Sequence, residues 1–284
     1  MHVFQTMRPL SRNTLLRLIL VLIIVGCAAA CHSNSEGKVA PAIAVSCSYF
    51  ECAVHDLLGE STVVNRLAEA GMCPGHFDVR PNQVAELRQC RLLVRFNFQD
   101  SLDQQIGNSG TLTIASVSLS SGMCIPDNYL STCRQVAEAM VHSGMLDSET
   151  ATTRLTVIEK RLAQTSATAQ TKMQQAGLTQ RPVITTGHQA EFCRWLKLNV
   201  LAAIGGADTA SVRQLDSAIS AAKEAHCRLV IANRPEGTQL PERIAEELEG
   251  HMVVFDNFPD LSPRQSSFDA MLLDNVDRLV KAAQ

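Results

Sequence analysis

Metal-binding residue types occur at three loop or strand-end positions of this chain. His76 lies in the Pro/Gly-rich loop Gly71–Pro81, His188 directly follows a short apolar run, and Asp256 follows the run Met252–Phe255. Ligands of parallel α/β sheets bind beyond the carboxyl ends of the strands. Neutral imidazole and carboxylate groups at such positions would suit a divalent transition metal.

Each of these residues also has a structural explanation when it is considered alone. His76 could be a surface or capping residue, and Asp256 could form an Asx turn or cap a helix. His188 precedes a predicted helix, where the positive end of the helix dipole disfavours imidazolium and keeps the ring neutral. A histidine there is more often structural than ligating. The metal hypothesis therefore depends on whether the three residues belong to one site.

Short apolar runs alternate with helical patterns on both sides of one long polar segment. The segment Asp147–Gln175 contains no Gly or Pro, and Leu155, Ile158 and Leu162 recur in it at helical spacing. This pattern predicts one helix of about 40 Å at 1.5 Å per residue. The alternation before and after it predicts an α/β fold of two lobes, each a mostly parallel sheet with flanking helices, joined by the long linking helix. The predicted boundaries are 1–26 for a signal peptide, 27–41 for a flexible tether, 42–146 for the first lobe, 147–178 for the linking helix and 179–284 for the second lobe.

The N-terminal segment has the pattern of a secretory signal. Arginines precede the apolar run Leu18–Val25, which is far shorter than the roughly 20 residues of a membrane span. The run is followed by Gly26-Cys27, and this ending resembles the bacterial lipobox, in which the chain is cut before a cysteine that carries a lipid. We therefore expect Cys27 to anchor the protein in the periplasm or on the outer face of the cytoplasmic membrane. The alternative is an ordinary signal peptide cut near Ala28–Ala30, and Cys31 is a weaker candidate for the anchor.

Composition limits the classes of function. The chain of 284 residues has a formal net charge of -3 and 4% aromatic residues, so it lacks the basic surface and stacking platforms of a nucleic-acid-binding protein. Its 46% of hydrophobic residues suffices for a packed core. Ten cysteines fit an oxidising compartment better than the cytosol.

The order of the three candidate ligands resembles that of ZnuA-like solute-binding proteins, which serve bacterial zinc and manganese ABC importers. The loop Gly71–Pro81 is similar to the family's first metal-binding loop, and Ile184–Ala190 is similar to its second-lobe strand and histidine. Asp256 matches the family's closing aspartate. The resemblance covers about residues 43–281 and includes the long linking helix.

This resemblance implies a non-enzymatic receptor that binds a divalent transition metal in the cleft between two lobes. It implies His76, His188 and Asp256 as ligands of zinc or manganese, or of copper if thiolates take part. It further implies an ABC permease as the partner and a monomer that contacts the membrane only through its N-terminal lipid.

Two departures from the family pattern concern the ligand set. The family's first histidine falls on Gly75, one position before His76, and its second histidine has no counterpart in Ser121–Asn128. The tripeptide Gly-Met-Cys occurs twice, ending at Cys73 and at Cys124, in loops that the family places at the cleft. A Cys73–Cys124 disulfide, thiolate ligation by one or both cysteines, and buried free thiols all stay open.

Two alternative functions also stay open. The chain could be an extracytoplasmic Cys-rich thiol or redox protein, although it contains no Cys-x-x-Cys motif. It could also be a member of the family that has lost or altered metal binding. A hydrolase is disfavoured, because the chain has neither a Gly-x-Ser-x-Gly elbow nor a His-Glu-x-x-His helix.

Overall fold

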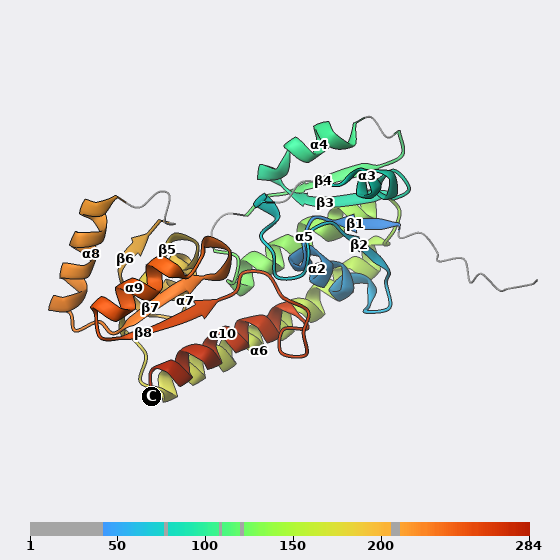
Figure 1. Ribbon diagram of the computed structural model, residues 1–284. Coiled ribbons are helices and arrows are strands. Elements are labelled where there is room, and N and C mark those ends of the chain that lie inside the picture. Colours follow the sequence, from blue (N-terminus) through green and yellow to red (C-terminus); the bar gives the residue numbers. More distant parts are fainter. Residues whose placement is uncertain (1–41, 77–78, 108–109, 120–121, 206–210) are drawn as a thin grey trace, which may run out of the picture. The chain divides into compact units, whose positions relative to one another are not determined.

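Two parallel β-sheets organise the residues that the structure describes (Figure 1). The computed structural model describes residues 42–76, 79–107, 110–119, 122–205 and 211–284, with His76 described in its backbone only. The predicted signal peptide and tether, including Cys27, lie outside the described residues. The strands are β1 (Ile43–Val45), β2 (Val64–Arg66), β3 (Leu92–Phe96) and β4 (Thr113–Val117) in the first lobe, and β5 (Pro182–Thr186), β6 (Asn199–Ile204), β7 (Leu229–Asn233) and β8 (His251–Phe255) in the second.

The two sheets share one strand order. It is β2-β1-β3-β4 in the first lobe and β6-β5-β7-β8 in the second, and every neighbouring pair is parallel. In each sheet the first strand therefore lies between the second and the third. The chain reverses its winding there, and the carboxyl ends of β5 and β7 flank this switch point in the second lobe. Ligands of doubly wound sheets bind at such a point.

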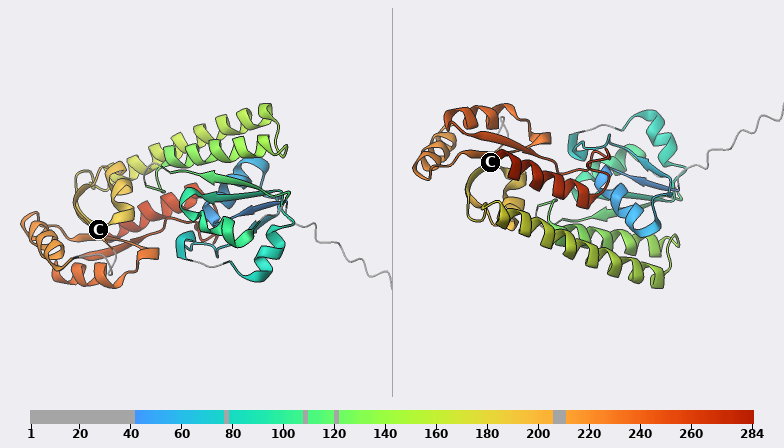
Figure 2. Two further views of the ribbon diagram at one scale, coloured as in Figure 1. Left: turned by 90° about the horizontal axis from the view of Figure 1, so that it is seen from above. Right: turned by 90° about the horizontal axis from the view of Figure 1, so that it is seen from below.

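Helices cover the sheets and connect the lobes. They are α2 (Ser48–Leu58), α3 (Pro81–Leu87), α4 (Ser101–Ile106) and α5 (Pro126–His142) in the first lobe, then α6 (Ser148–Gln175), and α7 (Ala190–Trp195), α8 (Val212–Glu224), α9 (Gln239–Glu247) and α10 (Phe268–Ala282) in the second. The long helix α6 begins where the Asp147 side chain accepts a hydrogen bond from the Thr150 amide at 2.8 Å. It packs against α2 and α5 of the first lobe and against α10 of the second (Figure 2).

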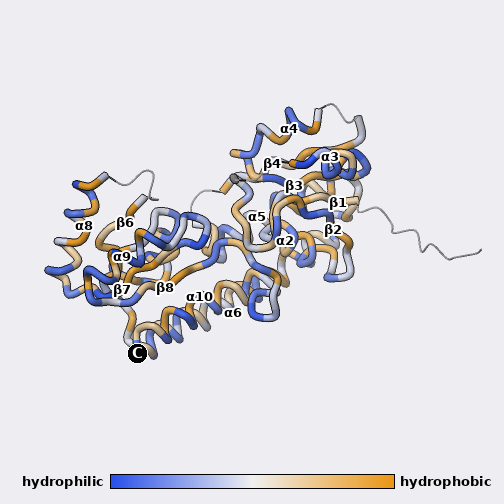
Figure 3. The backbone as a smooth tube through the Cα atoms, in the orientation of Figure 1, coloured by the Kyte–Doolittle hydropathy of each residue, from blue (hydrophilic) through white to orange (hydrophobic). Residues whose placement is uncertain are grey.

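Strand alternation places apolar side chains on both faces of each sheet. Ile43 and Val45 join a large core with α2, α5, α6 and α10, whereas Ala44 faces a smaller core with residues of α3 and α4. In the second lobe, Leu229 belongs to the large core and Val230 to a core beneath α8 and α9. The helices are amphipathic, and hydrophobic and hydrophilic residues alternate along α6 and α10 in Figure 3. One apolar core is thus shared by both lobes and by the linking helix.

The predicted fold class, two α/β lobes joined by one long helix, is confirmed. Helix α4 was not predicted, because its six residues offer only Leu102 and Ile106 as apolar positions. Among the residues described, no helix combines the length and the apolar character needed to cross a membrane.

Candidate metal site

His188 lies at the carboxyl end of β5, in the short 3₁₀ turn Gly187–Gln189. Its Nδ1 atom lies 2.6 Å from Oε1 of Glu236, which belongs to the equivalent turn Arg234–Glu236 after β7. The two residues therefore meet at the switch point of the second sheet. The His188 side chain is 68% exposed and the Glu236 side chain 13%, so the imidazole faces solvent while its carboxylate partner is largely covered.

The Glu236 carboxylate lines a small cavity at the same strand ends. This cavity of about 160 Å³ is lined by Thr186, Gly205, Glu236, Gly237, Gln239, Leu240 and Pro241. Oε2 of Glu236 is buried and has no hydrogen-bond partner. Burial alone would raise the pKa of Glu236, but the hydrogen bonds and the charge of His188 outweigh it and lower this pKa. The hydrogen bond to Glu236 raises the pKa of His188, against partial burial of the ring. This direction is opposite to the one expected from the helix N-terminus alone, which would keep the ring neutral.

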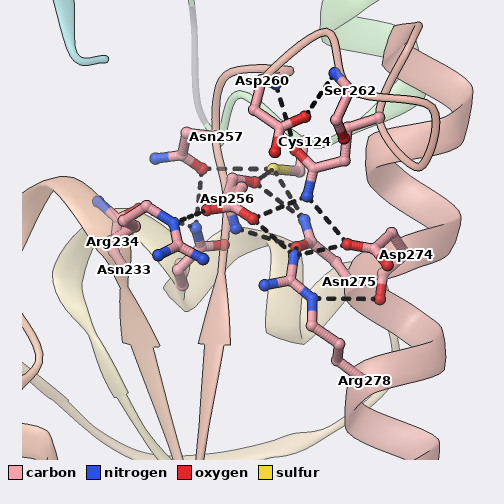
Figure 4. A network of polar contacts seen from close by, with 12 residues as sticks. Cys124, Asn233, Arg234, Asp256, Asn257, Asp260, Ser262, Asp274, Asn275 and Arg278 are labelled. Atoms are coloured by element: carbon pink, nitrogen blue, oxygen red, sulfur yellow. Dashed lines mark hydrogen bonds and ion pairs between the residues drawn. The ribbon is translucent and has the colours of Figure 1, made fainter. Parts of the chain in front are cut away.

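Asp256 follows β8, as predicted, but its carboxylate is held by cationic and amide groups (Figure 4). Oδ1 accepts a hydrogen bond from Nε of Arg234 at 2.6 Å. Oδ2 accepts hydrogen bonds from Arg278 at 2.7 Å and from Gln265 at 2.8 Å. Burial would raise the pKa of Asp256, but these hydrogen bonds and the charge of Arg278 lower it. Three hydrogen bonds thus engage this carboxylate, one at Oδ1 and two at Oδ2.

The main chain at Asp256 is also fixed on both sides. Nδ2 of Asn275 donates to the Asp256 carbonyl, and the Asp256 amide donates to Oδ1 of Asn275, both at 2.9 Å. Beside it, Oδ1 of Asn257 accepts from Gln189 at 2.8 Å, and Gln189 also donates to Oδ1 of Asn233 at 3.2 Å. Buried amides thus connect the ends of β5, β7 and β8. Such a network preorganises the strand ends around His188.

Cys124 of the first lobe contacts this network directly. Its thiol donates to the Asp256 carbonyl at 3.1 Å and to Oδ1 of Asn257 at 3.3 Å. Cys73 and Cys124 are both free, so of the alternatives left open by the sequence the disulfide is absent from the structure. The physical reason is that the two side chains have different surroundings. Cys124 is fully buried and its thiol contacts the second lobe, whereas Cys73 lies partly exposed in its own loop.

Most thiols in the described residues are unsuited to redox chemistry or to metal ligation. Burial raises the pKa of seven of these thiols. The affected residues are Cys47, Cys52, Cys90, Cys124, Cys133, Cys193 and Cys227. Because the thiolate is both the nucleophile and the metal ligand, a buried neutral thiol is inert. This disfavours the thiol or redox alternative and the use of Cys124 as a ligand.

The loop Gly71–Pro81, which resembles the family's first metal-binding loop, is described except for residues 77–78 and the His76 side chain. Its turn Pro74–His76 is anchored by Gln99, whose side chain donates to the Pro74 carbonyl at 2.9 Å. The loop also reaches the second lobe, because the Gly71 amide donates to the Pro259 carbonyl at 3.1 Å. The His76 side chain lies outside the described part of the structure, so its role as a ligand stays a prediction.

The candidate ligands His188 and Asp256 therefore have separate partners. His188 meets Glu236, and Cys124 meets the main chain of Asp256. Among the described side chains, no group of three or more His, Cys, Asp or Glu residues is placed to hold a metal ion. The sequence interpretation missed Glu236. The signal that could have found it is the stretch Asn233-Arg-Pro-Glu236, which follows a buried strand just as His188 does.

Comparisons with known proteins identify the class to which this fold belongs. A metal-free mutant of the periplasmic metal binding protein from Candidatus Liberibacter asiaticus superimposes with a TM-score of 0.71 at 10% identity, covering 85% of this chain and 99% of that one. The manganese-bound form of that protein, in a structure whose name gives no mutation, has the same values. A zinc-bound deletion mutant of ZnuA has a TM-score of 0.70 at 16% identity, covering 85% of this chain and 97% of that one. The fold is that of periplasmic metal-binding proteins.

The family assignment comes from sequence. Residues 43–282 match the family described as zinc-uptake complex component A, periplasmic, and the chain belongs to this family. Its members are metal carriers and not enzymes. Compared with curated proteins by sequence, the chain has no significant match.

Proposed function

We propose that this protein is the extracytoplasmic solute-binding component of an ABC importer and that it captures a divalent transition metal, zinc or manganese, between its lobes. The observation that carries the proposal is the position of His188, a largely exposed imidazole at the switch point of the second sheet, on the fold of a zinc-uptake family. His76 is the expected ligand from the first lobe. The metal is the transported solute and not a resident cofactor.

The second-lobe geometry is suited to capture by a neutral imidazole. Because Nδ1 of His188 faces Glu236, the proton of the neutral ring lies on Nδ1 and the lone pair on Nε2. That lone pair is available to an incoming cation. One imidazole nitrogen from each lobe, completed by water, would give a site that weakens when the lobes separate. Release to a permease would then require only a small separation of the lobes.

Metal binding by the mature chain tests this proposal. Zinc and manganese binding would be measured by calorimetry, with metal content determined on purified protein. We expect His188→Ala to lower zinc affinity by at least 100-fold without unfolding the protein, because it removes one of few ligands. His251→Ala is a matched control, since His251 is exposed at the opposite end of strand β8. Failure of the parent protein to bind either metal would refute the proposal.

A second candidate function is a family member whose metal binding has been altered or lost. It is favoured by the partners of Asp256, the carboxylate that the family resemblance implies as a ligand. Both of its oxygens accept hydrogen bonds from arginine. Under this alternative, His188→Ala and the parent protein would have equal affinity, or neither would bind metal.

We also propose that Cys27 carries a lipid that holds the protein at the membrane, where it meets its permease as a monomer. Cys27→Ser should release the protein from the membrane fraction or leave its signal uncleaved, whereas Cys31→Ser should have little effect. An unmodified N-terminus in the mature parent protein, determined by mass spectrometry, would contradict the anchor.

A further inference from the structure

Glu236 and Asp256 both follow strands of the second sheet, but their surroundings differ. Asp256 accepts hydrogen bonds from two arginines and a glutamine, and it lies in a buried network. Glu236 faces His188 and has a second oxygen without a hydrogen-bond partner. We propose that Glu236, and not Asp256, is the carboxylate that serves the metal site, and that it acts by positioning His188. This inference rests on the proposed function.

The contact between Glu236 and His188 has the geometry of a positioning interaction. Oε1 lies 2.6 Å from Nδ1, a short charge-assisted hydrogen bond. Histidines that ligate metals commonly donate their other N–H to a carboxylate, which fixes the tautomer and the orientation of the ring and increases its basicity. Glu236 therefore directs Nε2 of His188 toward the metal. It does so without being a ligand itself.

Burial separates this pair from an ordinary surface ion pair. Holding a carboxylate away from water costs free energy unless a charged or hydrogen-bonding partner offsets it. Glu236 is 13% exposed, and its partner His188 is 68% exposed. The Glu236 carboxylate is thus covered, whereas the His188 imidazole is exposed to solvent. An ion pair that only stabilised the fold would not need this difference in exposure. Both residues flank the switch point between β5 and β7.

The turn after β7 contacts Asp256 through one residue and supplies Glu236 as another. Arg234 and Glu236 belong to the same 3₁₀ turn. Arg234 neutralises Asp256 at 2.6 Å, and Glu236 reaches His188 two residues later. One turn therefore removes a carboxylate from the metal site and supplies another beside the histidine. Arg278 completes the neutralisation of Asp256 from α10.

The test compares four variants of the mature protein by two independent readouts. Zinc affinity is measured by competition with a chelator, and the tautomer of His188 is measured in metal-free protein by ¹⁵N NMR. The variants are Glu236→Ala, Glu236→Gln, Asp256→Asn and the control Glu246→Ala, whose side chain is exposed on α9. Thermal unfolding of each variant verifies that it is folded.

We expect Glu236→Ala to lower zinc affinity about 10- to 100-fold, the usual effect of removing such a partner, and to lower the Nδ1–H tautomer fraction. Glu236→Gln should retain that tautomer, because its amide oxygen still accepts from Nδ1, and should recover part of the affinity. Asp256→Asn should stay within about threefold of the parent, as the engaged carboxylate is not a ligand.

Three outcomes would overturn the inference. If folded Glu236→Ala had the zinc affinity and the His188 tautomer of the parent, the positioning role would be refuted. The proposed function would still stand if His188→Ala showed its expected loss of zinc affinity. A loss of tenfold or more in folded Asp256→Asn would restore Asp256 as the carboxylate of the site. Absence of zinc binding by the parent would refute the proposed function and this inference with it.

Discussion

Arg161 of the linking helix should be among the strongest single contributors to stability outside the apolar core. Its guanidinium donates to both oxygens of Asp56 on α2, at 2.6 and 2.7 Å, and its Nε lies 3.1 Å from Asp269 on α10. Asp56 also accepts from Tyr129 at 2.7 Å, and Asp269 accepts from Thr165 at 2.6 Å. One side chain thus joins both lobes to the linking helix.

The magnitude follows from the burial of these groups. Removing one partner of a fully buried ion pair costs about 3–5 kcal/mol, whereas exposed pairs contribute about 0–1 kcal/mol. Asp56 and Asp269 are each 14% exposed, but Arg161 is 37% exposed, so water screens part of the interaction. Arg161→Met keeps the aliphatic packing, and each carboxylate keeps one hydroxyl partner. We therefore expect a loss of about 2–3 kcal/mol in the free energy of unfolding.

Urea unfolding measures this loss. With a slope of about 3 kcal/mol per M for a chain of this size, the midpoint should fall by about 0.7–1 M. Arg154→Met is the matched control, because Arg154 is exposed two turns earlier on α6. A double-mutant cycle with Asp56→Asn should give a coupling of about 1–2 kcal/mol. Equal midpoints for the Arg161 and Arg154 variants, or no coupling, would refute the reasoning.

Two further predictions concern the network at Asp256. The folded-state pKa of Asp256 is lowered below its ordinary value of 3.8, so its contribution to stability is complete above that pH and is lost as pH falls through the lower folded value. The melting temperature of Asp256→Asn should therefore be below that of the parent at pH 7 and approach it below pH 3.8; a difference that does not change with pH would contradict this. In native protein, iodoacetamide should modify the partly exposed Cys73 and leave the buried Cys124 unmodified, as read by mass spectrometry. Rapid modification of Cys124 would mean that its contacts with the second lobe open readily.

The pattern of apolar residues sufficed to predict the architecture, because short apolar runs alternate with helical patterns on both sides of the long helix. Runs such as Leu92–Phe96, apolar except for Arg95, are buried on both faces and are typical of parallel strands. The long helix was predicted for the same kind of reason, since it has an apolar stripe and no breaker. Helix α4 escaped prediction because two apolar residues give no period. Sequence periodicity thus predicts elements that are extensively buried. It does not predict a short helix that depends on contacts with its neighbours.

The candidate site was predicted less completely, because its contacts join residues that lie far apart in the sequence. His188 and Asp256 do lie at strand ends, since the end of a buried run is visible in sequence. Their partners are not visible. Arg234 and Arg278 are each 22 residues from Asp256, on opposite sides of it in sequence. The repeated Gly-Met-Cys tripeptide left the state of its two cysteines open for the same reason, because identical local sequences do not specify where a side chain points.

The engagement of Asp256 also bears on which metal the protein selects. Imidazole nitrogens suit zinc, whereas carboxylate and water oxygens suit manganese, and simple nitrogen or oxygen sites bind manganese more weakly than zinc. If Asp256 stays with Arg234 and Arg278, and Glu236 acts only through His188, the protein ligands are nitrogens alone. The site then lacks the protein oxygen ligand that would offset the weaker binding of manganese. Zinc should displace manganese in direct competition. If manganese instead bound as tightly as zinc, a carboxylate oxygen of Asp256 or of Glu236 would have to enter the metal's coordination shell.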